Sequence, residues 1–315
     1  MLRSEDIISG FGQSADSADL EVIFQELNTL RRPTLEDEDE ISYFDWVLVK
    51  RKGIELGFAD SAYLNAEPSM RWGHGELIFC QVYFYSSFDG ISQFEGELPF
   101  NLTFSDNRST ARQKLQRHES SRRSWKSDTW VLADYNTTVI YSEKTGLVER
   151  VSCRKPPAPI VQSRSVKWPD VTEIISAIGG PTTDLGKLFD QALLDTALND
   201  DEIDLSQDVG MTIHLANGGA APALVQAITF HANRDVDSTG WPGALPLNLN
   251  FDDSPEILRK KIGERPTQES DSLTTGHGIW HFPEYTLHVL YSNFDNCLLR
   301  VTIRAPGTWK CIDDS

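Results

Sequence analysis

Sulfur-containing residues are scarce in this sequence. Its 315 residues include four cysteines and three methionines. The cysteines, at positions 80, 153, 297 and 311, form no CxxC pair and mostly lie in apolar runs. This spacing argues against a disulfide scaffold and against a zinc site built from paired cysteines. We therefore expect reduced, partly buried thiols, no metal and no other cofactor.

Long apolar segments are also missing. The longest apolar stretches, such as residues 76–85, have the length of a strand, whereas a membrane-spanning helix needs about 20 residues. The first 21 residues contain acids where a secretory signal would have an apolar core. We expect a cytoplasmic protein with no membrane partner.

Recognisable catalytic signatures are absent. The sequence contains no Walker A loop, no GxGxxG turn, no GxSxG elbow and no HExxH motif. His277 and His281 are four residues apart, but their setting, GHGIWHFPEY, is glycine-rich and strand-like rather than helical, so we expect no metal there. These absences favour a binding protein over an enzyme, and no catalytic residue is predicted.

Basic residues are outnumbered by acidic ones. The chain has 29 Lys and Arg against 47 Asp and Glu, a net charge of −18. Nucleic acid is therefore not an expected ligand, because phosphate binding needs a basic surface. The acid is concentrated in residues 1–95, with 18 acids and 7 bases, and in residues 170–242, with 12 acids and 2 bases. A protein partner with a basic surface fits this distribution.

The second half of the chain repeats the first. The segment GELPFNLTFSDNRSTARQKLQR from Gly96 returns as GALPLNLNFDDSPEILRKKIGER from Gly243, an offset of 147 residues. A second segment, WVLADYNTTVIYSEKTGLVERVSCRKP from Trp130, returns from Trp280 at an offset of 150. A fixed internal offset of this size indicates two copies of one domain.

The sequence predicts an α+β protein with two tandem repeats of a domain whose antiparallel β-sheets are flanked by helices. The first repeat spans residues 1–155, with an acidic half (1–95) and a motif block (96–155). A Pro-rich linker covers 156–169. The second repeat spans 170–315, with an acidic half (170–242) and a motif block (243–306). A helix followed by three strands occurs twice in each copy, which leaves open whether each domain is itself an internal duplication.

Several elements can be placed from local signals. Apolar residues at helical spacing predict a helix over residues 19–30, capped by Ser17 or Asp19. The LP motif at 98–104 is expected to be a strand, followed by a helix over about 105–115. In the second copy, Ser254 caps the motif helix and Gly263 ends it. The recurring aromatic residues are assigned to the core, namely Trp130, Trp280, Tyr135, Tyr141, Tyr285 and Tyr291.

The acidic clusters and two loop tryptophans are the partner-binding candidates. A tryptophan beside glycine, proline or charge is a candidate interface anchor. Solvated charged loops, acid–base carboxylates and calcium ligands are alternatives for the two acidic clusters. The basic residues between Arg108 and Lys126 are expected to form the polar face of the motif helix and the loop after it, where they could balance acids of the preceding half-repeat. The candidates are Glu36, Asp37, Glu38, Asp39, Glu40, Trp72, Asp200, Asp201, Glu202, Asp204 and Trp241.

The motif blocks resemble a known family pattern. The sequence LPFNLTFSDNRSTARQKL, then Trp130, then YNTTVIYSEKTGLVERVSC resembles bacterial immunity proteins that neutralise polymorphic or type VI secreted toxins. It also looks like the tandem-repeat β-lactamase inhibitor and small outer-membrane lipoprotein families. The expected lack of a secretion signal favours the immunity proteins. The usual glycine after the motif helix is present as Gly263, whereas the first copy has Arg117 near that position.

The resemblance implies a cognate inhibitor that covers the active site or substrate groove of a toxin. A nuclease is the expected target, because its basic surface would attract an acidic inhibitor. A protein-interaction scaffold or adaptor is the second hypothesis. A hydrolase that uses acidic-cluster carboxylates is the third, and it predicts a pocket with two buried carboxylates about 5–10 Å apart.

Overall fold

The chain forms two compact units, residues Met1–Ala158 and Pro159–Ser315. The computed structural model describes residues 3–35, 43–118, 121–161, 168–190, 194, 197, 202–216, 223–272 and 274–306. The boundary lies within the predicted Pro-rich linker. On its two sides, the Ala158 N–H donates to the Leu64 carbonyl and the Ile160 N–H donates to Asn233 Oδ1.

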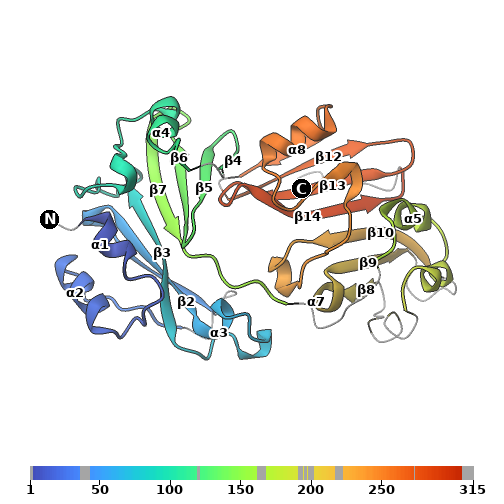
Figure 1. Ribbon diagram of the computed structural model, residues 1–315, viewed down its shortest axis with the longest axis horizontal. Coiled ribbons are helices and arrows are strands. Elements are labelled where there is room, and N and C mark those ends of the chain that lie inside the picture. Colours follow the sequence, from blue (N-terminus) through green and yellow to red (C-terminus); the bar gives the residue numbers. More distant parts are fainter. Residues whose placement is uncertain are drawn as a thin grey trace. The chain divides into compact units, whose positions relative to one another are not determined.

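Each unit contains one seven-stranded antiparallel sheet, and the two sheets have the same strand order (Figure 1). The first is ordered β1-β2-β3-β7-β6-β5-β4, and the second is ordered β8-β9-β10-β14-β13-β12-β11. The predicted α+β fold with two tandem sheet domains is thereby confirmed. In each sheet, a three-stranded meander and a four-stranded meander join through their last strands, β3 with β7 and β10 with β14. Two copies of a helix-and-three-strand unit account for six of the strands, and β4 or β11 is the additional edge strand.

The first unit runs through seven strands, four α-helices and three short 3-10 helices among its described residues. In chain order these are α1 (Ser4–Ile8), α2 (Ala18–Glu26), β1 (Phe44–Val49), η1 (Lys50–Lys52), β2 (Ile54–Asp60), α3 (Ser61–Leu64), η2 (Ser69–Arg71), β3 (Leu77–Tyr85), η3 (Pro99–Asn101), α4 (Arg108–Lys114), β4 (Ser121–Arg123), β5 (Ser127–Val131), β6 (Asn136–Tyr141) and β7 (Val148–Arg154).

The second unit repeats this sequence of elements with different helices before its sheet. In chain order its described elements are α5 (Val171–Ala177), η4 (Thr182–Lys187), β8 (Glu202–Leu205), α7 (Ser206–Val209), β9 (Met211–Ala216), β10 (Leu224–His231), η5 (Asp235–Asp237), η6 (Pro246–Asn248), α8 (Pro255–Ile262), β11 (Gln268–Asp271), β12 (Thr275–His281), β13 (Thr286–Ser292) and β14 (Cys297–Arg304).

One face of each sheet carries the hydrophobic core. Side chains alternate across a strand, so every second residue can face the helices. In the second unit, Ile174 of α5 and Leu258 of α8 share a core with alternate residues of the central strands, such as Ile213, Ile228 and Val301. The repeated Trp130 and Trp280 are buried, as predicted. Cys80 and Cys153 are buried free thiols, and burial raises the pKa of Cys153 to about 12.

Helix α2 is shorter than the apolar spacing predicted. Ser17 caps it, accepting a hydrogen bond from the Leu20 N–H. At the other end Asn28 adopts a positive φ of 51°, and the Thr29 N–H reaches back to the Phe24 carbonyl. This is the Schellman pattern, which ends a helix. Leu30 therefore lies beyond the helix and is 97% exposed.

The LP motif forms a 3-10 turn, so the strand predicted over residues 98–104 is wrong. Phe100 and Asn101 in η3 have φ angles of 60° and 56°, and Leu247 and Asn248 in η6 have 57° and 55°. The left-handed region is incompatible with a strand and unfavourable for a bulky residue, whereas asparagine tolerates it. The repeated Asn of the motif is explained by this conformation.

A lysine from the following helix holds the turn in place. Lys114 Nζ donates to the Asn101 carbonyl at 2.7 Å and to the Asp106 carboxylate at 2.7 and 2.9 Å. Asp106 also accepts the Thr103 N–H at 2.7 Å. The Lys114–Asp106 pair thus provides hydrogen-bond partners for the Asn101 carbonyl and the Thr103 N–H, which have no strand partner in this turn. Most of the repeated motif residues therefore serve to stabilise the turn.

The second unit repeats the arrangement and allows it to be tested. Lys261 Nζ donates to the Asn248 carbonyl and to Asp253, each at 2.7 Å. We expect Lys261→Met to lower the free energy of unfolding by about 2 kcal/mol, because charge-assisted hydrogen bonds to half-buried groups are lost. Lys260→Met, at an exposed position of the same helix, removes the same charge and should change it by less than about 0.5 kcal/mol. Urea unfolding of the full chain measures both, and equal effects would contradict the role of the turn.

The basic stretch of the first motif block pairs within its own block. Arg112 contacts Asp128 at 2.7 Å, Lys114 contacts Asp106 and Lys126 contacts Glu143 at 3.1 Å. The expectation that these cations balance acids of the preceding half-repeat is wrong for these pairs. The antiparallel β5–β6 pairing and the α4 helix bring acids of the same block closer.

Candidate functional site

The structure describes part of the predicted partner-binding set. The cluster from Glu36 to Glu40 lies outside the described residues, as do Asp200 and Asp201. Glu202 and Asp204 are described, and both lie on β8. They are two residues apart on one strand, so their side chains share one face of the sheet.

Trp72 is a packed residue rather than an exposed anchor. Its side chain is 8% exposed and lies in a small cluster with Tyr43 and Tyr63, at ring-centroid distances of 5.1 and 4.9 Å. Its indole N–H donates to the Glu67 carbonyl at 2.8 Å. Neighbouring glycine and charge suggested a loop surface, but the α3–η2 segment folds back over the ring.

Trp241 is likewise a core residue and is 4% exposed. It occupies the place of Phe94 in the first unit. The Phe94 N–H donates to the Tyr85 carbonyl, and the Trp241 N–H donates to the His231 carbonyl, each at 2.9 Å. Its ring packs on Phe230 at 5.1 Å. The prediction that Trp72 and Trp241 are accessible anchors is therefore not supported by their burial.

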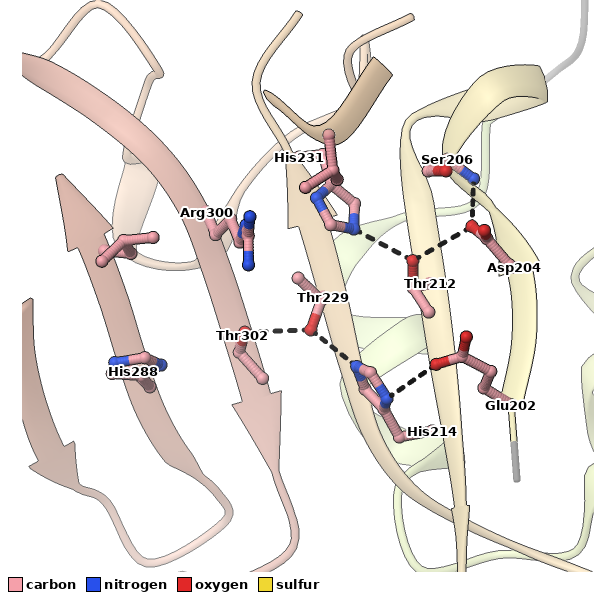
Figure 2. Close-up of a pocket in the computed structure, with 12 residues that line it drawn as sticks. Glu202, Asp204, Ser206, Thr212, His214, Thr229, His231, His288, Arg300 and Thr302 are labelled. Atoms are coloured by element: carbon pink, nitrogen blue, oxygen red, sulfur yellow. Dashed lines mark hydrogen bonds and ion pairs between the residues drawn. The ribbon is translucent and has the colours of Figure 1, made fainter. Parts of the chain in front are cut away.

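A polar pocket lies on the face of the second sheet that does not carry the hydrophobic core. It has a volume of about 350 Å³. Strands β8, β9, β10, β13 and β14 contribute to it, and Figure 2 shows the side chains converging across the strands. The lining residues are Glu202, Asp204, Ser206, Thr212, His214, Thr229, His231, Val236, His288, Leu290, Arg300 and Thr302.

One hydrogen-bonded chain crosses the pocket from β8 to β10. Asp204 Oδ1 accepts the Ser206 N–H at 2.9 Å and the Thr212 hydroxyl at 3.3 Å. The same hydroxyl lies 3.0 Å from His231 Nε2 (Figure 2). Asp204 is exposed, whereas His231 is buried. The exposed Asp204 carboxylate is thus oriented by two uncharged donors, the Ser206 N–H and the Thr212 hydroxyl.

The guanidinium in the pocket is held by a buried aspartate. Arg300 Nε donates to Asp235 Oδ2 at 2.6 Å, and Arg300 Nη2 donates to Oδ1 at 3.2 Å. His231 Nδ1 lies 2.9 Å from the same carboxylate. The bidentate pair fixes Arg300 in the wall of the pocket.

A second chain links Glu202 to the centre of the sheet. His214 Nε2 lies 3.0 Å from the Thr229 hydroxyl, which lies 3.0 Å from the Thr302 hydroxyl. His214 Nδ1 is 3.5 Å from Glu202, a loose contact (Figure 2). Burial lowers the pKa of His214 below its ordinary value, although Glu202 acts in the opposite direction. His214 is therefore mainly neutral at pH 7.

His288 is the most strongly perturbed histidine of the pocket. Burial, then the neighbouring His277 and Arg300, lowers its pKa from 6.5 to about 4. The rings of His277 and His288 are 5.2 Å apart. Protonation of His288 is thus easier in the unfolded chain than in the folded one.

Lowering the pH is expected to reduce the free energy of unfolding through protonation of His288. The unfolded state binds the proton first, so the contribution of this group to stability is full above pH 6.5 and is lost as the pH falls towards 4. His288→Gln should reduce the loss of unfolding free energy between pH 7 and pH 4.5 by on the order of 1–2 kcal/mol. Urea unfolding at the two pH values, with His281→Gln as an exposed control, measures this. An unchanged pH dependence in His288→Gln would refute it.

The buried carboxylates have structural partners. Among the described residues, Asp60 accepts backbone N–H groups at the start of α3, and Asp106, Asp128 and Asp235 form ion pairs. None of these four carboxylates is among the residues that line the polar pocket. Within that same part, no three His, Cys, Asp or Glu side chains converge as they would around a metal ion.

Sequence reasoning missed most of the pocket. Thr212, His214, Thr229 and Arg300 alternate with core residues on three strands, and each resembles an ordinary solvent-facing strand residue. A signal was available in the repeat itself, because aligning the two copies strand by strand shows where the second copy has replaced large side chains. Of the helices that the structure describes, none has the length and apolar character to cross a membrane.

The fold and the repeated turn define the class of protein, a tandem repeat of an α+β domain with one helix-covered sheet per repeat. No family model and no curated protein matches the sequence. Among solved structures, an extracellular protein containing a SCP domain from Bacillus anthracis str. Ames aligns over 95% of each chain, with 9% sequence identity and a TM-score of 0.26. A similarity this weak carries no argument about fold or function.

Proposed function

We propose that this protein is an immunity protein that binds and neutralises a secreted bacterial toxin, namely a nuclease with a basic substrate groove. It acts in the cytoplasm by covering that groove. The proposal starts from the resemblance of the motif blocks and is supported by how charge is distributed in the folded units.

The observation that carries the proposal is the local pairing of the basic residues. Described ion pairs of the motif blocks, such as Lys114–Asp106 and Lys261–Asp253, stay within their block. Arg300, which pairs with Asp235 of the acidic half, is an exception. Among the described residues, the cations of the motif blocks therefore neutralise little of the excess acid of residues 1–95 and 170–242, which a basic partner would complement. Such a partner would be attracted at long range and bound faster.

Co-expression with a neighbouring toxin gene tests the proposal. We expect the protein to restore growth of cells that produce the toxin, and the purified pair to bind with an association rate that falls as salt is raised. A catalytically inactive toxin variant serves for the binding measurement. If growth is not restored and the pair does not bind at low salt, the proposal is wrong. Binding to an endogenous non-toxic assembly instead would favour a scaffold.

A further inference from the structure

The two sheets differ at equivalent positions of the face opposite the helices. Strand register gives the correspondence: Trp46 pairs with Gly57 in the first unit, and Glu202 pairs with His214 in the second. On the next strand, Tyr83 corresponds to Thr229. A filled aromatic surface in one copy is thus replaced by acidic, imidazole and hydroxyl groups in the other.

The aromatic side chains of the first unit cover its sheet. The Trp46 and Tyr83 rings lie 5.6 Å apart, and Tyr83 stacks near Tyr85 at 6.0 Å. Trp46 lies so close over Gly57 that any side chain at position 57 would overlap its ring. In the second unit, Thr229 is smaller than the corresponding Tyr83, and His214 takes the position of Gly57. The pocket of about 350 Å³ lies at these positions.

The pocket carries negative charge that its own lining leaves uncompensated. Glu202 is 41% exposed and faces the mainly neutral His214 at 3.5 Å. Asp204 is bonded to a backbone N–H and a hydroxyl, which are neutral donors. Among the described lining residues, the guanidinium of Arg300 is committed to Asp235, and no lysine contributes. A cationic ligand group complements this arrangement.

We propose that this pocket receives an arginine side chain of the protein partner, with Glu202 and Asp204 as its counter-ions. The planar guanidinium has five donors, which can serve two carboxylates together with hydroxyl and imidazole acceptors, whereas an ammonium offers three. This inference rests on the proposed function, since it names the place where a basic toxin surface is anchored. It also predicts recognition of the isolated guanidinium group.

The first test uses the full-length protein alone, with N-acetyl-arginine amide as the probe. NMR of the histidine rings should show His214 and His231 resonances moving as the probe is added, with saturation at millimolar concentrations. The neutral citrulline analogue should have no such effect, and the lysine analogue should bind more weakly. No movement with the arginine probe up to tens of millimolar overturns the inference.

Charge-neutralising variants locate the interaction. Glu202→Gln with Asp204→Asn should weaken probe binding at least about tenfold and slow association with the partner by about the same factor. Glu264→Gln with Glu284→Gln removes the same charge from two exposed positions of the same unit and should change either by less than about twofold. Equal effects of the two double variants overturn the inference.

A transplant of the first-unit residues tests the cavity itself. The triple variant Glu202→Trp, His214→Gly, Thr229→Tyr should fill the pocket and abolish probe binding while retaining cooperative unfolding. If this variant does not fold, the charge-neutralising pair decides. The Glu202→Gln, Asp204→Asn variant could still protect cells fully from the toxin and bind the partner as tightly as before. That result would overturn the arginine site and leave the proposed function standing. If the unaltered protein does not protect cells from the toxin, the proposed function is rejected. The probe titration would still test whether the pocket binds a guanidinium group.

Discussion

Replacing Gly210 with alanine is expected to unfold the sheet of the second unit, whereas Gly263→Ala should be tolerated. Both glycines have positive φ angles, 73° and 76°. A Cβ at Gly210 would overlap the backbone of Gly240 and Trp241, while a Cβ at Gly263 meets nothing within 4 Å. Backbone cannot swing away as a flexible side chain can, so we expect a loss of at least about 4 kcal/mol for Gly210→Ala. The left-handed conformation alone accounts for about 1 kcal/mol in Gly263→Ala.

The first unit offers the same comparison. Gly53 has a φ of 63° and lies against the backbone of Ser92 and Phe94, whereas Gly146 has a φ of 69° and open space around it. Hydrogen–deuterium exchange of the full chain can assign each effect to its unit. Protection should be lost in β9 and β10 for Gly210→Ala and in β2 and β3 for Gly53→Ala. Similar losses in Gly263→Ala or Gly146→Ala would show that dihedral strain, and not the close crossing, dominates.

Replacing Arg112 with methionine is expected to destabilise the first unit by about 3–5 kcal/mol. Asp128 is completely buried and accepts two hydrogen bonds from Arg112, at 2.7 and 2.8 Å, and one from the Tyr141 hydroxyl at 3.1 Å. Burial, with the charge of Asp128, raises the pKa of Tyr141, so the phenol stays a donor. Removal of the guanidinium would leave the carboxylate buried without a cation.

Urea unfolding measures this effect, with Arg117→Met as the control because position 117 is exposed and carries the same charge. The control should lose less than about 0.5 kcal/mol. The double variant Arg112→Met, Asp128→Asn should recover a large part of the loss, since the orphaned charge is gone. A double variant no more stable than Arg112→Met would show that packing of the arginine stem, rather than the ion pair, matters at this site.

Local chemistry made much of the fold predictable. Ser17 and Ser254 cap their helices as expected, because a cap depends on a few adjacent residues. Trp130 and Trp280 were placed in the core correctly, because alternation along a strand reveals which residues are buried. The internal offset predicted two copies of one domain, and the identical strand orders confirm the repeat.

Other features depended on contacts distant in sequence. The LP segment has the composition of a strand, but Lys114, from the helix that follows, stabilises its left-handed residues. Trp241 looked exposed beside glycine and proline, yet the crossing at Gly210 carries it into the core. The residues adjacent to the LP segment and to Trp241 in the sequence do not reveal either contact.

The sequence by itself determined the repeat, the α+β class, the helix caps and the excess of acid in the first half of each copy, because each of these is a property of composition or of short-range spacing. The tertiary structure decided which polar residues share a surface. Glu202, His214, Thr229 and Arg300 are brought together because strand pairing places positions up to about a hundred residues apart side by side. Whether such a surface is filled, as by Trp46, or open, as beside Glu202, depends on the volumes of neighbouring side chains across strands, and no single segment of the sequence contains that information.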